Sequence, residues 1–381
     1  MTTAPSAPAS LRVPMNDLAL QHAPIREEME AALADVVASC GFIRGPQVSA
    51  FEEAFASYCG VDHCVGVSNG TDALVLALRA LGVGEGDEVI TTPHTFGATG
   101  EAICHVGARP VFVDVEDDHL CLNPSLVEAA ITERTKVILP VHIYGHPADT
   151  EALGEIASRH GLDVVEDAAQ AQGARRGART TGAMGRVGCF SFYPGKNLGA
   201  YGDAGGVTSD DEALAQRVRS LGNHGMPLAG PKFHYDELGY NNRMDGFQGA
   251  VLGVKLPHLE SWNDNRRRIA ARYGEQLEGV ADLRLPSEAD GARHVYHLYT
   301  IRTGQRDGLA EHLQAAGVEC AVMYPLPLHL TRAYAFLGYR EGAFPVSEEA
   351  CRRILSLPIF PDLEDDLVDH VAGQVRAFFG A

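Results

Sequence analysis

The sequence predicts an α/β protein with a mostly parallel sheet and helices on both of its faces, followed by a smaller C-terminal α+β domain. Short apolar runs alternate with helical patterns between residues 64 and 210. Parallel strands need crossover helices and are buried on both faces, so this alternation favours a parallel sheet. After residue 280 the pattern changes to a short mixture of strands and helices. The six or seven expected strands are 64–67, 88–91, 110–114, 137–141, 164–166, 188–192 and 206–208.

Helices are expected before, between and after these strands. Apolar residues recur at helical spacing over 24–40, with Pro24 at the start and Gly41 beyond the end. The next helix places Phe51 and Phe55 on one face, and another opens at 73–81. A long helical stretch over 246–277 is expected to bridge to the second domain.

The C-terminal part predicts a small α+β unit. Residues 295–301 and 319–323 are expected as strands, and 308–316 and 363–379 as helices. We therefore expect an N-terminal segment and large α/β domain over 1–245, a bridging helix over 246–280 and a small domain over 281–381.

Composition and charge exclude several classes of function. The chain has 381 residues, 45% of them hydrophobic, and its 50 acidic and 31 basic side chains give a formal charge of -19. That sign is wrong for a protein that neutralises many nucleic-acid phosphates. No apolar run is long enough for a membrane helix and the first ten residues lack the pattern of a secretory signal, so a cytoplasmic location is expected. The eight cysteines lack C-x-x-C spacing, and no metal site is predicted.

Three motifs carry candidate chemistry. SNGTD at 68–72 follows a strand and opens a helix, where free N–H groups and the helix dipole attract an anion, although an ordinary helix cap has the same composition. Asp167 ends an apolar strand and could keep a pyridine nitrogen protonated, or it could cap a helix. Lys196 lies in a Gly/Pro-rich loop after a strand, where a desolvated amine could form a Schiff base; most lysines are simply solvated.

Taken together, these motifs resemble the DegT/StrS family of sugar aminotransferases, a branch of the fold-type I pyridoxal-phosphate enzymes. The resemblance covers nearly the whole chain. Its most specific parts are the Asp167 strand and the Lys196 loop. The matching segments are 13–18 (VPMNDL), 41–46 (GFIRGP), 68–74 (SNGTDAL), 95–99 (TFGAT), 166–170 (EDAAQ), 191–206, 239–245 (GYNNRMD) and 355–358 (LSLP).

The resemblance implies pyridoxal 5'-phosphate as the cofactor and a role for each matching residue. Lys196 and Asp167 would be catalytic, as the Schiff-base lysine and the partner of the ring nitrogen. The cofactor phosphate would be held by Gly70 and Thr71 together with the Ser191 hydroxyl. Phe96 would stack on the ring and Gln170 would lie beside its oxygen substituent. Asn241 would reach the phosphate from a neighbouring subunit, which implies a homodimer with shared active sites.

The substrate contacts are expected at Tyr193, Tyr324 and His329. Two positions depart from the family pattern. Gln172 stands where many relatives have a histidine, and Met323 stands before Tyr324 where His-Tyr is frequent. Both departures bear on substrate contacts and leave the cofactor set intact.

The predicted reaction moves an amino group from glutamate to a nucleotide-diphosphate-linked keto sugar. Segments 191–203 and 254–263 look most like members acting at carbon 3. Alternatives are a carbon-4 keto sugar or cyclitol aminotransferase, and a non-catalytic cofactor-binding regulatory protein. A dehydratase-type relative would lack the lysine, and a nicotinamide-dependent oxidoreductase would need a glycine fingerprint after a strand. Local cations for the nucleotide are sought at Arg44, Lys232, Arg243 and Arg332.

Overall fold

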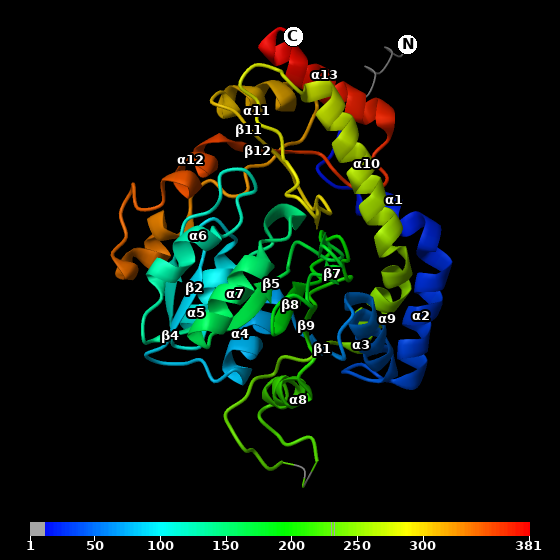
Figure 1. The fold of residues 1–381 in the computed structure, drawn as a ribbon. Helices are drawn as coiled ribbons and strands as arrows, with labels where there is room; N and C mark the ends of the chain where they lie inside the picture. The colour runs from blue at the N-terminus through cyan, green and yellow to red at the C-terminus, as the bar shows by residue number, and fades with distance from the viewer. Residues whose placement is uncertain (1–11, 230, 232) are drawn as a thin grey trace.

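A seven-stranded sheet forms the centre of the molecule (Figure 1). The computed structural model describes residues 12–229, 231 and 233–381, so Lys232 lies outside the described residues. The strands lie in the order β1 (His63–Val67), β9 (Gly205–Ser209), β8 (Val187–Ser191), β5 (Asp163–Asp167), β4 (Thr135–Ile138), β2 (Glu88–Thr91) and β3 (Arg109–Phe112). Only β9 runs antiparallel to its neighbours in this sheet. The predicted mostly parallel sheet and the positions of all seven strands are confirmed.

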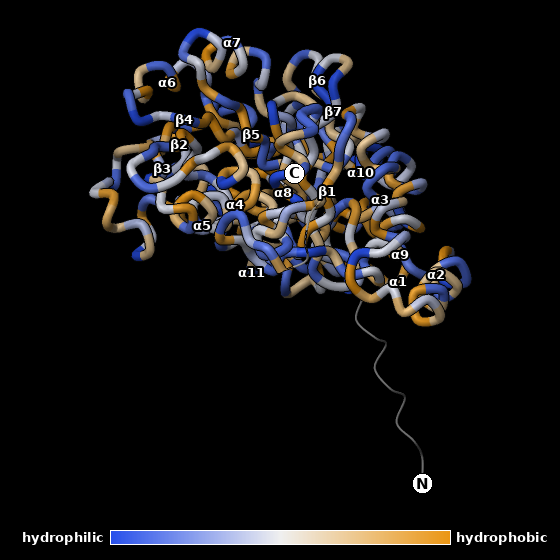
Figure 2. Tube along the Cα trace, turned by 90° about the horizontal axis from the view of Figure 1, so that it is seen from below, coloured by the Kyte–Doolittle hydropathy of each residue, from blue (hydrophilic) through white to orange (hydrophobic). Residues whose placement is uncertain are grey.

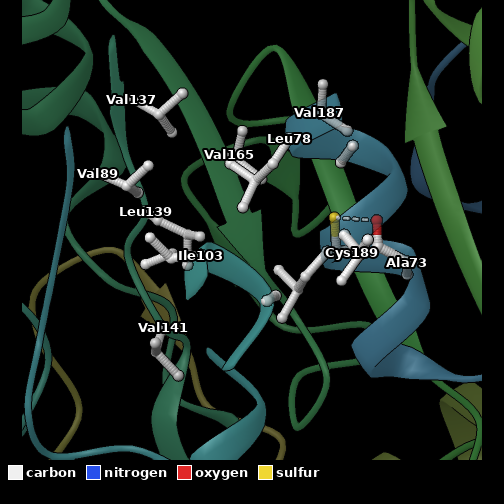
Figure 3. Close-up of a cluster of buried hydrophobic side chains, with 14 of the residues drawn as sticks. Ala73, Leu78, Val89, Ile103, Val137, Leu139, Val141, Val165, Val187 and Cys189 are labelled. Carbon is white, nitrogen blue, oxygen red and sulfur yellow. Dashed lines mark hydrogen bonds between the residues drawn. The ribbon is translucent and has the colours of Figure 1, made fainter. Parts of the chain in front are cut away.

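Helices cover both faces of the sheet because strand side chains alternate between them. Val89, Val137 and Val165 belong to the core formed with α4 (Gly70–Ala80), α5 (Gly97–His105) and α8 (Glu212–Leu221). Their neighbours Ile90, Ile138 and Val164 pack on the other face, against α6 (Pro124–Val127) and α7 (Thr150–His160). Figure 3 shows the first of these cores, with Leu78 and Ile103 directed at the strand valines.

The hydropathy of the strands reflects their burial on both faces of the sheet. Figure 2 shows hydrophobic stretches along β2, β4 and β5. All four residues of β2 are buried, including the polar Glu88 and Thr91. A sheet buried on both faces therefore reads in sequence as short continuous apolar runs.

The N-terminal helices differ from the prediction in their limits. In place of one helix over 24–40, the chain forms α1 (Leu18–His22), a 3-10 turn (Ala23–Ile25) and α2 (Arg26–Ser39). Asp17 caps α1 by accepting hydrogen bonds from the N–H groups of Ala19 and Leu20. The left-handed residue that ends α2 is Cys40, with φ 52°, and not the glycine that follows it. The helix carrying Phe51 and Phe55, α3 (Pro46–Cys59), is confirmed.

The predicted bridging stretch consists of two helices. It contains α9 (Gly246–Lys255), a 3-10 turn (Leu256–His258) and α10 (Leu259–Leu277). Pro257 occupies the turn, where its missing N–H costs no helical hydrogen bond. Figure 1 shows α10 running up to α13 (Asp365–Phe379) of the C-terminal part. The domain limits at 245 and 280 stay a prediction.

The C-terminal part contains α11 (Arg306–Ala315), α12 (Pro345–Arg353), α13 and an antiparallel pair, β11 (Tyr299–Arg302) and β12 (Ile354–Leu357). Two strand predictions were wrong in extent. Val295 and Leu298 donate their backbone N–H groups to the carbonyls of Gly145 and Tyr144 in the loop after β4, so β11 begins only at Tyr299. Within 319–323 only Ala321 pairs with β12, since Glu319 donates to the carbonyl of Val13.

Short strands complete the described structure. β6 (Arg175–Arg176), β7 (Arg179–Thr180) and β10 (Ala292–Arg293) form a three-stranded sheet. All eight cysteines are free, and no helix of the described ranges has both the length and the apolar character needed to cross a bilayer. Within the same ranges, no cluster of three or more His, Cys, Asp and Glu side chains could hold a metal ion.

Candidate active site

A cavity of about 590 Å³ opens at the carboxyl ends of β5 and β8 and at the N-terminus of α4. Ligands of open α/β sheets bind at this edge. The structure brings together nine of the residues predicted for the site. These are Gly70, Thr71, Phe96, Asp167, Gln170, Ser191, Tyr193, Lys196 and Tyr324.

One end of the cavity is formed by Gly70, Thr71 and Ser191. Gly70 and Thr71 are the first two residues of α4, so their backbone N–H groups have no acceptor within the helix. A Cβ atom on Gly70 would lie 2.6 Å from the Cβ of Ser191, so only glycine leaves the serine in place. Two free N–H groups, a hydroxyl and a helix N-terminus make an anion site.

Asp167 lies in the wall of the cavity and is 5% exposed. Its Oδ2 accepts a hydrogen bond of 2.8 Å from Thr99, and its Oδ1 accepts one of 3.2 Å from the N–H of Ala169. Burial raises the pKa of Asp167, while these hydrogen bonds and the nearby Lys196 oppose that rise. A carboxylate held in this way stabilises a cationic group placed opposite it.

Glu166 has a different role from Asp167, although the two residues are adjacent in sequence. Strand alternation directs it to the opposite side, where it accepts hydrogen bonds from the N–H groups of Gly182, Met184 and Gly185. It also contacts His142 at 2.9 Å. Of the two carboxylates at the end of this strand, only Asp167 lines the cavity.

The loop that carries Lys196 is tightly closed. The N–H of Lys196 donates to the carbonyl of Tyr193, and the N–H of Ala200 donates to that of Phe192. A Cβ atom on Gly199 would lie 2.2 Å from the carbonyl oxygen of Pro194, so the close approach requires glycine. The loop therefore holds Lys196 in one position at the end of β8.

Burial lowers the pKa of Lys196 to about 8, and the Asp167 carboxylate opposes this change. A neutral amine is the form that attacks a carbonyl carbon and accepts a proton. The desolvated side chain predicted from the sequence thus has the physical setting of a nucleophile and base.

Gln170 connects the wall of the cavity at the end of β5 to the C-terminal part of the chain. Its side-chain oxygen accepts a hydrogen bond of 2.7 Å from the N–H of Tyr144, which leaves the amide nitrogen to donate to the Tyr324 hydroxyl at 3.2 Å. Tyr324 also lies against Phe96, with ring centroids 5.7 Å apart. Phe96 and Tyr193 remain 57% and 58% exposed at the cavity, which leaves both rings free for a ligand.

Two predicted residues lie elsewhere. His329 is buried, pairs with Glu348 at 2.9 Å and does not line the cavity, so its predicted contact with substrate is not formed here. Nothing in the sequence indicates that Glu348, on α12, is the partner of His329. Asn241 is exposed on the loop between α8 and α9 and lies outside the cavity of its own chain.

The two departures from the family pattern have structural contacts. Gln172 is fully buried and donates to the carbonyl oxygens of Ser191 and Ala169, at 2.6 and 3.2 Å. It therefore ties the end of β8 to the turn after β5. Met323 takes part through its carbonyl oxygen, which accepts a hydrogen bond from Tyr144.

Sequence reasoning missed the residues that support the site from behind. Thr99 holds Asp167, and Thr95 holds Thr99 at 2.8 Å; their i, i+4 spacing at the start of α5 was the available signal. Lys255 is 3% exposed and donates to the carbonyl of Gly199 at 2.7 Å, beneath the Lys196 loop. Nothing in the sequence around Lys255 distinguishes it from a surface lysine.

The three candidate cations within the described residues, Arg44, Arg243 and Arg332, do not line the cavity of this chain. Arg44 donates to the carbonyl of Arg219, and Arg243 donates to the side chain of Asn223, each at 3.0 Å. Arg332 is exposed. Their predicted role at the nucleotide stays a prediction.

Comparison with known proteins matches residues 23–376 to the DegT/DnrJ/EryC1/StrS aminotransferase family. A dTDP-3-amino-3,4,6-trideoxy-alpha-D-glucose transaminase of Streptomyces venezuelae is 48% identical, over 96% of each chain. The crystal structure of S. venezuelae DesV in complex with a ketimine intermediate has a TM-score of 0.94 at 48% identity, over 97% of this chain and 99% of that one. Ntda from Bacillus subtilis with bound cofactor PMP has a TM-score of 0.89 at 29% identity, over 97% and 86%. The chain belongs to the DegT/DnrJ/EryC1/StrS aminotransferase family.

Proposed function

We propose that this aminotransferase uses pyridoxal 5'-phosphate to move an amino group from glutamate to carbon 3 of a nucleotide-diphosphate-linked keto sugar. The observation that carries the proposal is the placement of Lys196 and Asp167 on one cavity that ends in an anion site. Membership of an aminotransferase family and the PMP reported in a structural neighbour support the same cofactor.

The residues of the cavity fit this cofactor along its whole length. Gly70, Thr71 and Ser191 would hold the phosphate, and the absence of a Cβ on Gly70 lets the Ser191 side chain lie next to the N-terminus of α4. Asp167 would face the ring nitrogen, and Phe96 would cover the ring. Gln170 would lie beside the ring's oxygen substituent, with its amide nitrogen toward the cavity.

When bound, the cofactor supplies an electron sink for the carbon that exchanges the amino group. Asp167 would keep the ring nitrogen positive by its charge, and Thr99 holds Asp167 in place. Lys196 would provide the amine that binds the cofactor. Its Nζ atom would also be the base that moves a proton between the substrate carbon and the exocyclic carbon of the cofactor, since burial favours the neutral amine.

The choice of carbon 3 rests on similarity. The 48% identical relative is named as a transaminase of a 3-amino nucleotide sugar, and its match covers almost the whole chain. Cofactor chemistry is the same at carbon 3 and carbon 4, so the difference lies in how the pocket orients the sugar. Tyr193 and Tyr324 are the two tyrosines of the cavity through which we expect this orientation.

Incubating the enzyme with glutamate and matched 3-keto and 4-keto nucleotide sugars tests the proposed substrate. We expect amination of the 3-keto sugar, with a k_cat/K_M at least about a hundredfold higher than for the 4-keto sugar, because a misplaced ketone loses near-attack geometry. Mass spectrometry detects the exchange of the keto oxygen for an amino group, and NMR assigns the carbon. Amination at carbon 4 alone would overturn the regiochemistry, and amination of a free cyclitol ketone alone would overturn the substrate class.

A homodimer with shared active sites is part of the proposal. Asn241 lies outside its own chain's cavity and is exposed, which suits a contact with the cofactor phosphate of a partner. Mixed dimers of Lys196→Ala and Asn241→Asp chains should then regain about a quarter of wild-type activity, since half of the dimers carry one intact site. Each variant alone serves as the control, and activity no higher than that of the two homodimers would show that each site uses one chain.

The regulatory alternative makes a different prediction for the same protein. A non-catalytic cofactor-binding protein would bind pyridoxal phosphate and transfer no nitrogen, so the substrate assay separates the two functions. The cytoplasmic location stays a prediction.

A further inference from the structure

Tyr144 is a buried residue that contacts both walls of the cavity without lining it. It lies in the loop after β4, in a 3-10 turn (Ile143–Gly145), and is 5% exposed. Its backbone N–H donates to the side-chain oxygen of Gln170 at 2.7 Å, and its hydroxyl donates to the carbonyl oxygen of Met323 at 2.5 Å. Tyr144 therefore reaches the large-domain wall through its main chain and the C-terminal wall through its side chain.

The direction of each hydrogen bond around Tyr144 follows from the donors available. A carbonyl oxygen can only accept, so the single hydroxyl proton of Tyr144 goes to Met323. His94, whose Nε2 lies 2.8 Å from the Tyr144 hydroxyl oxygen, must then donate its Nε2–H. Its Nδ1 is left to accept from Cys351, whose sulfur lies at 3.4 Å. The chain from Cys351 through His94 and Tyr144 to Met323 uses every proton once.

This hydrogen-bond network requires the neutral form of the His94 imidazole, and the surroundings of His94 favour that form. His94 is 1% exposed, and burial lowers its pKa to about 4. Arg302 also disfavours the charged form, and Asp114 opposes it. The arrangement is thus independent of pH over the neutral range.

Tyr144 adopts a backbone conformation that few bulky residues accept. Its φ of 58° lies in the left-handed region. Such strained residues persist where the surrounding structure determines them, and they concentrate at functional sites. Here the conformation directs the N–H to Gln170 and, at the same residue, the side chain to Met323.

We propose that Tyr144 is a positioning residue for the keto-sugar half of the reaction, because its hydroxyl fixes Met323 and thereby places Tyr324 between Gln170 and Phe96. The proposal rests on the proposed function. Tyr324 follows Met323 directly, contacts Gln170 at 3.2 Å and lines the cavity. Tyr144 binds the backbone carbonyl oxygen of Met323, so this hydrogen bond does not depend on the methionine side chain.

Tyr144→Phe isolates this role. It removes the hydroxyl and keeps both the ring and the backbone N–H that orients Gln170. We expect the K_M for the keto nucleotide sugar to rise about tenfold, the size of one lost hydrogen bond that leaves buried partners unpaired. The k_cat and the single-turnover rate of amino transfer from glutamate to the bound cofactor should stay within about twofold of wild type.

Tyr273→Phe is the matched control. Tyr273 is fully buried and its hydroxyl also donates to a backbone carbonyl, that of Pro358 at 3.0 Å, outside the cavity. Both variants should lose similar thermal stability, and only Tyr144→Phe should raise the sugar K_M. An equal effect of the two on the sugar K_M would mean that Tyr144 is merely structural, and so would overturn the proposal.

A double-mutant cycle with Tyr324→Phe tests whether Tyr144 acts through Tyr324. The two substitutions should be non-additive in the sugar K_M, since the second removes the group that the first displaces. Additive effects would contradict the proposal. If Tyr144→Phe does not fold, His94→Leu removes the donor that holds the Tyr144 hydroxyl toward Met323 and should raise the sugar KM selectively, by less than tenfold because the Tyr144–Met323 bond can still form; an unchanged KM would count against the proposal. A wild-type enzyme that aminates no nucleotide sugar would instead refute the proposed function.

Discussion

Lys196→Ala should abolish transamination, with k_cat reduced by at least about a thousandfold, because one substitution removes both the cofactor-binding amine and the proton-transferring base. The variant should still fold, since Lys196 lines a cavity and its loop is closed by backbone contacts of Phe192 and Ala200. Steady-state kinetics and a thermal melt measure the two properties. Lys136→Ala, on the exposed side of β4, is the control and should keep full activity.

Borohydride should fix the cofactor to Lys196, and the small number of lysines makes the assignment clean. The chain has four, at positions 136, 196, 232 and 255. Lys255 is the informative competitor, since burial lowers its pKa to about 8 as well. It lies outside the cavity, hydrogen-bonded to Gly199 and 4.7 Å from the centre of the Tyr201 ring.

Reactivity should separate Lys196 from the exposed Lys136 before any cofactor is added, whereas Lys255 shares the lowered pKa and differs by lying outside the cavity. With a pKa of about 8 against an ordinary 10.5, half of Lys196 is neutral at pH 8. Its reaction with an aldehyde probe should therefore rise with pH and reach half of its maximum rate at about pH 8. Peptide mapping that finds the label, or the reduced cofactor, on Lys255 or Lys136 would refute the assignment.

Asp167→Asn should lower k_cat by about a hundredfold or more while the protein remains folded, since a neutral amide cannot stabilise a positive ring nitrogen by charge. The amide still accepts the hydrogen bond from Thr99. Burial already raises the pKa of Asp167, so replacing the carboxyl with a neutral group should cost little stability in the cofactor-free protein. Kinetics, cofactor titration and thermal melts of both proteins give the comparison.

Glu166→Gln is the control next to it in sequence. Glu166 is fully buried and accepts three backbone hydrogen bonds on the side of the strand away from the cavity. Its loss should lower the melting temperature more than the turnover. Wild-type turnover in Asp167→Asn, or a larger loss of turnover in Glu166→Gln, would show that Asp167 does not handle the ring nitrogen.

The sheet could be predicted from the sequence because both of its faces are buried. Runs such as Val89-Ile90 and Val164-Val165 have one side chain in each core, so they stay apolar without alternation. The C-terminal strands could not be predicted in extent. Val295 and Leu298 have a strand-like pattern but bond to a distant loop, and Glu319 bonds to Val13. Such contacts depend on the tertiary arrangement, which no local pattern contains.

The same distinction applies to the candidate site. The sequence predicts the residues that the sheet topology places, but not those whose contacts depend on tertiary packing. Gly70, Asp167, Ser191 and Lys196 follow strands or open a helix, so their convergence follows from the topology of the sheet. His329 was expected at the cavity because of its loop, and only the packing of α12 supplies its partner Glu348. The supporting residues, among them Thr99, Lys255 and Tyr144, act through hydrogen bonds to distant parts of the chain, which the sequence does not reveal.

Transfer of ¹⁵N from glutamate to a 3-keto nucleotide sugar is the most direct test of the proposed reaction. With purified enzyme and pyridoxal phosphate, NMR of the product should show ¹⁵N bonded to carbon 3, with 2-oxoglutarate formed in equal amount. The Lys196→Ala protein should give neither product. If the wild-type enzyme binds the cofactor but the sugar gains no ¹⁵N, the proposal is contradicted. It is also contradicted if ¹⁵N is found at another carbon.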